Sequence, residues 1–226
     1  MNVIEAIESR ISCRAFLDTA VPLETIREIL DLARLAPSGG NIQPWHVHVV
    51  AGKKRQELVD RAIASFTANP DGEQPREYLG YPVKWVQPYK TRRFDVGKAL
   101  YSALGIDRRD KTARGEQMLR NFYFFDAPVG LMFTIHKTLW PGQLNDLGIF
   151  MGNVILLARE FGLHTCAQGF WQNVNRTVHE VLEIPYDYII YSGMALGHID
   201  PNHPANQVKS GRGEVDDFAT FMGFDD

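Results

Sequence analysis

The feature that most constrains the fold is the long interval between the first two strand-like segments. An alternating run at 45–50 predicts one strand and 128–136 predicts another. Between them, helical spacing recurs around Leu58 to Phe66, at 94–104 and at 112–123. A parallel α/β unit needs only one crossover helix. Several helices in succession favour an α+β layered fold over a doubly wound sheet.

Capping residues and hydrophobic spacing predict the other elements. Asn2 and Glu5 form a capping-box pattern for a short helix that ends near Arg10, with Val3, Ile4 and Ile7 on its apolar side. The chain also predicts helices at 22–35, 143–161 and 174–182, an extended run at 163–170 and a strand at 188–197. We therefore expect one domain over 1–226, with at least four strands and a proline- and aromatic-rich excursion at about 69–125.

Composition excludes several classes of protein. The 226 residues are 45% hydrophobic and 23% charged, which is typical of globular chains. The formal charge of −3 gives none of the basic excess that nucleic acid binding needs, so we expect no nucleic acid partner. The richest apolar stretch, 149–158, is too short to cross a bilayer, and the first residues lack the apolar region of a secretory signal. We expect no membrane association and a cytoplasmic location.

Sequence motifs for metal or nucleophile chemistry are weak. The two cysteines, Cys13 and Cys166, are far apart and form no Cys-x-x-Cys motif, which fits a reducing compartment. His46 and His48 share a strand face, but no third ligand is marked, so half-buried strand histidines are the favoured interpretation. Pairing of Cys166 with His164 is equally weak. We therefore expect no bound metal, and we expect no side chain to serve as a catalytic acid, base or nucleophile.

An anion clamp is indicated near the N-terminus. Arg10, Ser12 and Arg14 alternate directly after the first predicted helix, so an extended backbone would direct all three side chains the same way. Two guanidiniums and a hydroxyl suit an anion, although a solvated surface stripe is the alternative. Lys209 and Arg212 in the polar tail could close over the same anion.

A glycine-containing loop between a helix and a strand is the second candidate. It contains Gly39 and Gly40, which let a backbone come close to a flat ligand, and Asn41 and Gln43, which both donate and accept hydrogen bonds. A simple capped turn is the alternative interpretation.

Together these motifs resemble the FMN-dependent nitroreductase family. The resemblance rests on Arg-x-Ser-x-Arg-x-Phe at 10–16, Pro-Ser-x-x-Asn-x-Gln-Pro-Trp at 37–45 and the tail arginine Arg212, in the family's order. The runs at 162–166 and 197–200 are also similar. The resemblance implies a mixed, largely antiparallel sheet wrapped by helices, and an intertwined homodimer with FMN at the subunit interface.

The resemblance also implies roles for particular residues. Arg10, Ser12 and Arg14 would hold the phosphate, ribityl chain and pyrimidine edge of FMN, and Lys209 and Arg212 would grip the phosphate. Further cofactor contacts would come from the 37–43 loop, partly from the partner subunit, and from the run after Cys166: Pro37, Ser38, Gly39, Asn41, Gln43, Gln168 and Gly169. The run 166–171 departs from the acidic Glu-Gly pattern of enteric-type members, which puts the contacts there in doubt.

The implied activity is a flavin-dependent NAD(P)H oxidoreductase with ping-pong hydride transfer through flavin N5. NADH or NADPH would be the donor, and a small aromatic acceptor, nitroaromatic or quinone-type, would be reduced. Candidate cleft residues are Trp85, Tyr89, Phe94 and Tyr101; for the aromatic block 122–125, core packing is favoured over a lid. A dehalogenase-like or flavin-consuming enzyme and a non-enzymatic FMN-binding or storage protein remain alternatives.

Overall fold

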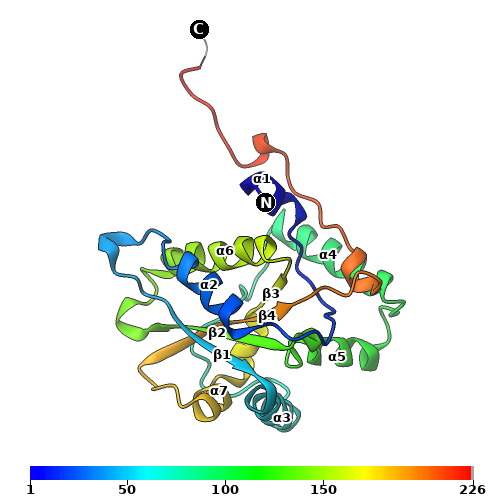
Figure 1. Ribbon diagram of the computed structural model, residues 1–226. Coiled ribbons are helices and arrows are strands. Elements are labelled where there is room, and N and C mark those ends of the chain that lie inside the picture. The colour runs from blue at the N-terminus through cyan, green and yellow to red at the C-terminus, as the bar shows by residue number, and fades with distance from the viewer. Residues whose placement is uncertain (225–226) are drawn as a thin grey trace.

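The computed structural model describes residues 1–224 and contains helices on both sides of a single sheet (Figure 1). Within these residues the helices are α1 Val3–Ser9, α2 Leu23–Ala33, α3 Gly52–Ala68, α4 Tyr89–Ala103, α5 Lys111–Leu119, α6 Leu144–Glu160 and α7 Asn175–Leu182. The strands are β1 His46–Ala51, β2 Val129–His136, β3 His164–Gln168 and β4 Tyr188–Gly197. In residues 1–224, no helix combines the length and apolar character needed to span a membrane.

The sheet has the order β1-β2-β4-β3, and every neighbouring pair of strands is antiparallel. One isolated parallel bridge, between Ser12 and Thr165, adds the N-terminal segment beside β3. The prediction of an α+β fold is confirmed. The residues between β1 and β2 form the multi-helix excursion that the spacing predicted.

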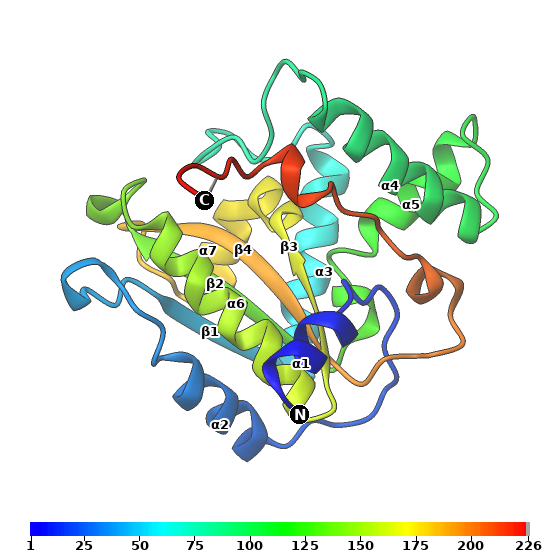
Figure 2. The same cartoon turned by 90° about the horizontal axis from the view of Figure 1, so that it is seen from above.

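Helices cover the sheet, with α6 crossing one face in Figure 2, and each face has its own apolar core. On β2, Leu131 and Phe133 point to the side covered by α2 and α6, whereas Met132 points to the side covered by α3 and α7. Because both faces are covered, β2 is buried along all but its last residue. This explains why 128–136 reads as a continuous apolar run.

Two aromatic rings press directly onto the sheet at glycines. Phe124 and Trp171 lie with ring centroids 4.6 Å apart. A Cβ at Gly130 would lie 2.4 Å from Phe124, and one at Gly193 would lie 2.2 Å from Trp171, so only glycine permits this packing. In the block 122–125 only Tyr123 is exposed, at 40%; the others are core residues, as favoured.

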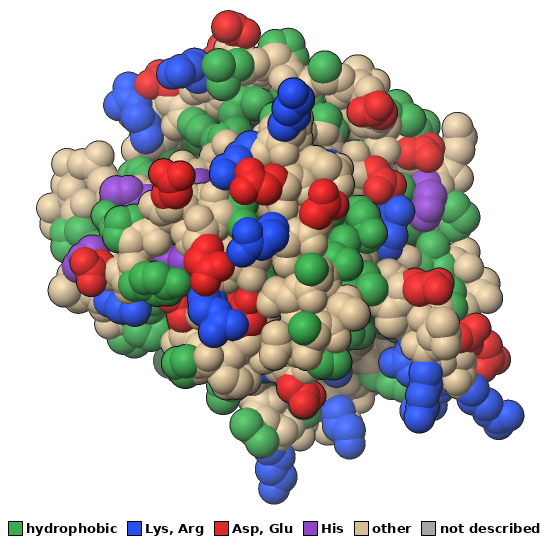
Figure 3. Space-filling view, turned by 90° about the horizontal axis from the view of Figure 1, so that it is seen from below, with side chains coloured by type: hydrophobic (Ala, Val, Ile, Leu, Met, Phe, Trp, Pro, Cys, Tyr) green, Lys and Arg blue, Asp and Glu red, His purple; other side chains and the backbone are tan. Residues whose placement is uncertain are grey.

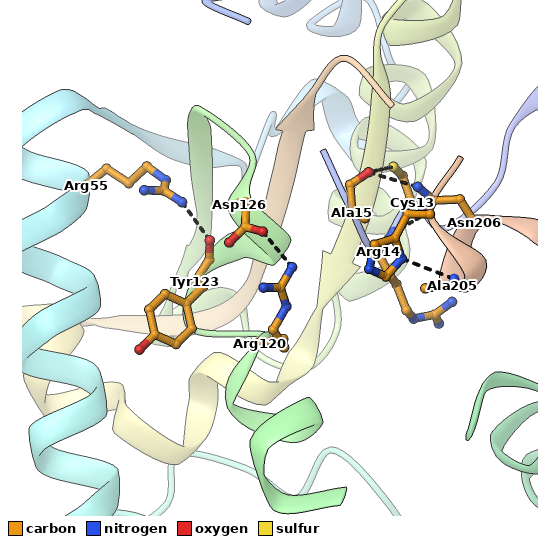
Figure 4. Close-up of polar contacts among 10 residues, drawn as sticks. Cys13, Arg14, Ala15, Arg55, Arg120, Tyr123, Asp126, Ala205 and Asn206 are labelled. Carbon is orange, nitrogen blue, oxygen red and sulfur yellow. Dashed lines mark hydrogen bonds and ion pairs between the residues drawn. The ribbon is translucent and has the colours of Figure 1, made fainter. Parts of the chain in front are cut away.

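The turn that contains this aromatic block has an unusual backbone conformation. Phe124, Phe125 and Asp126 all have positive φ, a region that bulky residues rarely adopt. Arg55 donates to the Tyr123 carbonyl at 2.6 Å, and Arg120 pairs with Asp126 at 2.6 Å (Figure 4). These contacts, together with burial of the rings, hold the turn.

Buried polar contacts anchor residues 69–88 of the excursion to the body. Glu73 accepts bonds from the Ser65 hydroxyl and from Thr177 at the start of α7. Glu77 bonds His179 on α7 at 3.1 Å and accepts the Ile190 N–H on β4 at 2.7 Å. The excursion is therefore fixed over α7 and β4 and is not a flexible linker.

Val3, Ile4 and Ile7, on the predicted apolar side of α1, are 54–68% exposed because no other part of the described chain covers them. Two predicted helix boundaries were wrong. The predicted helix at 94–104 begins five residues earlier, at Tyr89, because the Gln87 side chain caps its first turn by accepting from Thr91. The predicted helix at 112–123 ends at Leu119, because residues 122–125 turn inward to the core.

Candidate functional site

An extended segment after α1 carries the predicted anion clamp. Cys13 donates its N–H to the Thr165 carbonyl at 3.0 Å, so the segment runs along β3. Buried Asn206 accepts the Arg14 N–H at 2.8 Å and donates to the Ala15 carbonyl at 2.9 Å (Figure 4). Cys13 and Ala15 are buried, while Ser12 is exposed and Arg14 is partly exposed, which agrees with the predicted alternation.

The four cations predicted for the clamp have no carboxylate partner among residues 1–224: Arg10 and Arg14 in this segment, and Lys209 and Arg212 in the tail. Within residues 1–224, the guanidinium of Arg14 donates only to the Ser12 carbonyl, at 3.3 Å, and that of Arg212 only to nearby tail oxygens such as Ser210 Oγ at 2.9 Å. Asn206 holds the start of the tail against Arg14, three residues before Lys209. The arrangement leaves positive charge available for an anion.

The charges on another surface of the protein are mixed and partly paired. On the face that α3 and α7 cover, acidic and basic side chains are interspersed (Figure 3). Several of them pair, as in Arg61–Glu180 at 3.2 Å and Lys54–Glu57 at 3.0 Å. Opposite charges cancel on such a mixed surface, so it does not attract a particular anion. The cations of the predicted clamp differ from it because they have no carboxylate partner among residues 1–224.

The loop at 37–43 is held in a strained conformation. Gly40, Asn41 and Gln43 have φ values of 57°, 56° and 53°. Ser38 Oγ accepts the Gln43 N–H at 3.0 Å, and Gly39 donates its N–H to Asp146 Oδ2 at 3.1 Å. Residues in this region persist only where their surroundings hold them, and they cluster at ligand sites. Pro37, Gly39, Asn41 and Gln43 are exposed, so a ligand can reach the loop.

Within a single chain, the 37–43 loop and the clamp residues lie far from each other. Gly39 contacts Asp146 in the first turn of α6, whereas Ser9, next to the clamp, contacts Arg159 in its last turn at 3.2 Å. An α-helix rises about 1.5 Å per residue, so these contacts are about 20 Å apart. Figure 1 shows the two segments at opposite ends of α6.

The end of β3 presents a buried polar group without a partner. Gln168 is 2% exposed and donates through Nε2 to the Asn121 carbonyl at 2.6 Å. Its Oε1 has no hydrogen-bond partner among the described residues. Such a group is costly unless a donor reaches it. The next residue, Gly169, is exposed and offers its backbone beside it.

The alternative chemistries are disfavoured by the environments of the side chains. Burial raises the pKa of Cys13 to about 12 and that of Cys166 to about 11, so neither is a thiolate near neutral pH. Burial, with Arg159 and His198, lowers the pKa of His164 to about 4, which makes it a poor base.

The two strand histidines belong to a separate small pocket. His46 Nε2 lies 3.3 Å from the Tyr188 hydroxyl, and His48 lines the same pocket of about 190 Å³. Burial also lowers the pKa of His48. Within residues 1–224, no group of three His, Cys, Asp or Glu side chains is placed to hold a metal.

A second pocket, of about 310 Å³, lies at the start of α4. It is lined by Trp85, Gln87, Lys90, Thr91, Arg93 and Phe94. Two of the four predicted cleft residues, Trp85 and Phe94, line it. Tyr89 is 57% exposed outside the lining, and Tyr101 packs under Arg114, 5.2 Å from its ring. Lys90 and Arg93 also line the pocket and were not predicted; their signal in the sequence is a pair of cations placed among aromatic residues.

Comparison with known proteins gives consistent matches. The sequence profile of the nitroreductase family matches residues 7–198. The chain is 38% identical over 218 residues to a nitrobenzene nitroreductase from Ectopseudomonas oleovorans, covering 96% of each protein. It is 36% identical over 221 residues to a 4-nitrobenzoate reductase from Nocardioides sp. (strain LMS-CY), covering 97% of this chain and 90% of that one.

The crystal structure of NfnB, an FMN and NADPH-dependent nitroreductase from Sphigopyxis sp. strain HMH, superposes with a TM-score of 0.96 at 38% identity. The match covers 99% of this chain and 100% of that one. The profile match and the full-length relatives agree with the order of motifs along the chain. The protein belongs to the nitroreductase family.

Proposed function

We propose that the protein is an FMN-dependent NAD(P)H oxidoreductase that reduces nitroaromatic acceptors, and also quinone-type ones, by a ping-pong reaction. The observation that carries this proposal is a set of four cations without a carboxylate partner among residues 1–224. Arg10 and Arg14 lie in the extended segment, and Lys209 and Arg212 lie in the tail whose start Asn206 holds against that segment. The family membership and the activities named for the relatives support it.

The residues present fit FMN. The four cations suit its phosphate and the negative charge of a reduced ring. Gln168 Oε1, which lacks a donor within the described chain, suits an N–H on the edge of the ring. The strained loop with Ser38, Gly39 and Asn41 offers exposed backbone to a flat ligand.

When bound, FMN supplies the hydride relay at N5 between the nicotinamide donor and the acceptor. The residues of this chain would bind the cofactor and orient it. Asn206 holds the backbone at Arg14, whose guanidinium would stabilise negative charge beside the ring. Lys209 and Arg212 would hold the phosphate end, and Gly169 would offer a backbone N–H. No side chain needs to act as a nucleophile toward the substrate, which fits the high pKa of the buried thiols.

We infer that a homodimer completes the site. In one chain the 37–43 loop and the clamp lie at opposite ends of α6, so a flavin site that uses both needs the loop of a second copy. Apolar side chains stand exposed where such a copy would pack: Val3, Ile4 and Ile7 on α1, and Phe218, Phe221, Met222 and Phe224 in the projecting tail (Figure 1). Exposed apolar surface of this extent is typical of an interface.

The test is a visible spectrum of the purified protein, loaded with FMN where necessary. Anaerobic NADH and then NADPH should bleach the flavin absorbance, and nitrobenzene should restore it. A flavin that neither donor bleaches, or a protein that does not bind FMN, would contradict the proposal. The donor that bleaches faster is the preferred one.

A further inference from the structure

We propose that Arg93 and Lys90 form an oxyanion-binding site in the pocket at the start of α4. The site would select flat ring ligands that carry a carboxylate or phosphate. The inference rests on the proposed function, because the pocket is taken as part of the cleft in which donor and acceptor bind.

The guanidinium of Arg93 is fixed by stacking and has no anion of its own. Its Cζ lies 5.1 Å from the Trp85 ring centroid and 5.3 Å from that of Tyr81. Neither Arg93 nor Lys90 forms an ion pair or a side-chain hydrogen bond with any residue in 1–224. Stacking orients a guanidinium and leaves its N–H edge available, which suits two-point binding of an oxyanion.

The rest of the pocket suits a ring. Its volume of about 310 Å³ is at the small end of ligand sites, and Trp85 and Phe94 supply apolar walls. Beside them, the Thr91 hydroxyl donates to Gln87 Oε1 at 2.9 Å. No carboxylate lines the pocket, so the two cations are the charged groups available to a ligand.

The helix that carries the pocket also contacts the tail. Arg92, next to Arg93, pairs with Asp217 in the tail at 3.8 Å. A Cβ at Gly213 would lie 2.7 Å from Arg92 Nη2, so the tail crosses α4 one residue after Arg212. The tail that carries the proposed phosphate ligand Arg212 therefore meets the first turns of α4, where the pocket lies.

Two ligands share this chemistry. One is an aromatic acceptor with a carboxylate, such as 4-nitrobenzoate, which differs from nitrobenzene by that single charge. The other is the 2′-phosphate of NADPH, which NADH lacks. Both present an oxyanion close to a flat ring: the carboxylate is bonded to the benzene ring, and the 2′-phosphate is on the ribose that bears the adenine. The experiment therefore measures the two ligands separately.

The experiment compares Arg93→Met and Lys90→Met with the parent protein, all loaded with FMN. Lys98→Met is the matched control, because Lys98 is exposed on the same helix and does not line the pocket. Calorimetry would measure binding of benzoate against neutral benzamide, and of 2′,5′-ADP against 5′-AMP. Arg93→Met should weaken binding of one or both anions about tenfold to a hundredfold and leave the neutral or less charged analogue unchanged. Arg93→Lys should recover part of the loss.

Kinetics identify the source of the anion. If Arg93→Met weakens binding of benzoate alone, and raises the KM for 4-nitrobenzoate but not for nitrobenzene, the site binds the acceptor. Loss confined to 2′,5′-ADP, with slower bleaching by NADPH but not NADH, assigns it to the donor. Equal effects on charged and neutral ligands, or no difference from Lys98→Met, would overturn the inference. Failure of the proposed function looks different, since the parent protein would then not reduce nitrobenzene at all.

Discussion

One buried asparagine organises the candidate cofactor site at the residue scale. Asn206 is 8% exposed and bonds the Arg14 N–H, the Ala15 carbonyl and the Asp200 carbonyl. It therefore fixes the backbone at Arg14 and holds the start of the tail against the extended segment. Sequence spacing predicted the clamp because strand alternation is local, but Asn206 lies 192 residues from Arg14 and had no local signal.

Replacing Arg14 with Met should weaken FMN binding about tenfold to a hundredfold, because it removes charge-assisted hydrogen bonds to the ligand while keeping the stem of the side chain. Quenching of flavin fluorescence on binding gives the Kd. Arg34→Met, which removes only the exposed pair with Asp31, is the control and should leave the Kd unchanged. An unchanged Kd for FMN in Arg14→Met would show that Arg14 does not bind the cofactor.

His164 should make the protein sensitive to mild acid. Burial, Arg159 and His198 lower the pKa of His164 to about 4 in the native state. Between about pH 6.5 and pH 4 the unfolded chain therefore binds a proton at this histidine and the native state does not. The free energy of unfolding should fall by about 1–2 kcal/mol from pH 6.5 to 4 after solvent screening and then level off. Urea unfolding measures this slope. His164→Asn, whose amide can still accept from Arg159, should flatten it; an equal slope in both proteins would exclude His164 as the cause.

At the scale of the elements, close ring-to-sheet packing ties the core to the site. Trp171 follows Gln168 and Gly169 and lies against Gly193 on β4, opposite Gln168 in the strand register. The apolar patterns predicted the strands, because burial of alternate residues is a local property. Which glycine faces a tryptophan is decided by packing between distant segments, so it was not predictable.

Gly193→Ala should destabilise the protein by about 2–3 kcal/mol, since the added methyl would lie 2.2 Å from Trp171. Gly115→Ala in α5 is the matched control: a Cβ there meets nothing within 4 Å, and the change should stabilise by about 0.5–1 kcal/mol. Chemical denaturation of both variants gives the comparison. Equal stabilities would show that the ring can move aside.

The anchor of the excursion depends on Glu77. Both ring nitrogens of buried His179 face oxygen acceptors, the Ile184 carbonyl at 3.0 Å and Glu77 at 3.1 Å. Glu77→Ala would leave His179 and the Ile190 N–H without this partner and should cost about 2–4 kcal/mol. Glu77→Gln keeps an acceptor for Ile190 and should cost much less. Limited proteolysis should cut Glu77→Ala faster within 69–88; protection equal to the parent would contradict the anchor.

At the scale of the whole molecule, the proposed site is divided between two subunits. Mixed dimers test this division. Arg14→Met and Asn41→Asp each impair one half of the site, and Asp tolerates the positive φ at position 41. If each site combines the clamp of one chain with the loop of its partner, a mixed dimer holds one intact site and should regain about half of the parent's bound flavin. No recovery in the mixed dimer would place both halves in one chain.

The sequence by itself determined the order of the elements, the α+β class and the motifs. These are local properties: hydrophobic period, capping, turn residues and the alternation of side chains along an extended backbone. The exact start of α4 was missed because residues 89–93 have no apolar period and depend on the Gln87 cap. Likewise, the apolar spacing of α1 could not reveal that the chain leaves this face uncovered.

Only the tertiary structure decided which motifs meet. It brought the tail to Arg14 through Asn206, fixed the excursion over α7 and β4, and set Lys90 and Arg93 beside Trp85 and Phe94 in one pocket. It also held the 37–43 loop and the clamp at opposite ends of α6. Contacts between distant segments depend on the summed packing of the whole chain, and no local period encodes them.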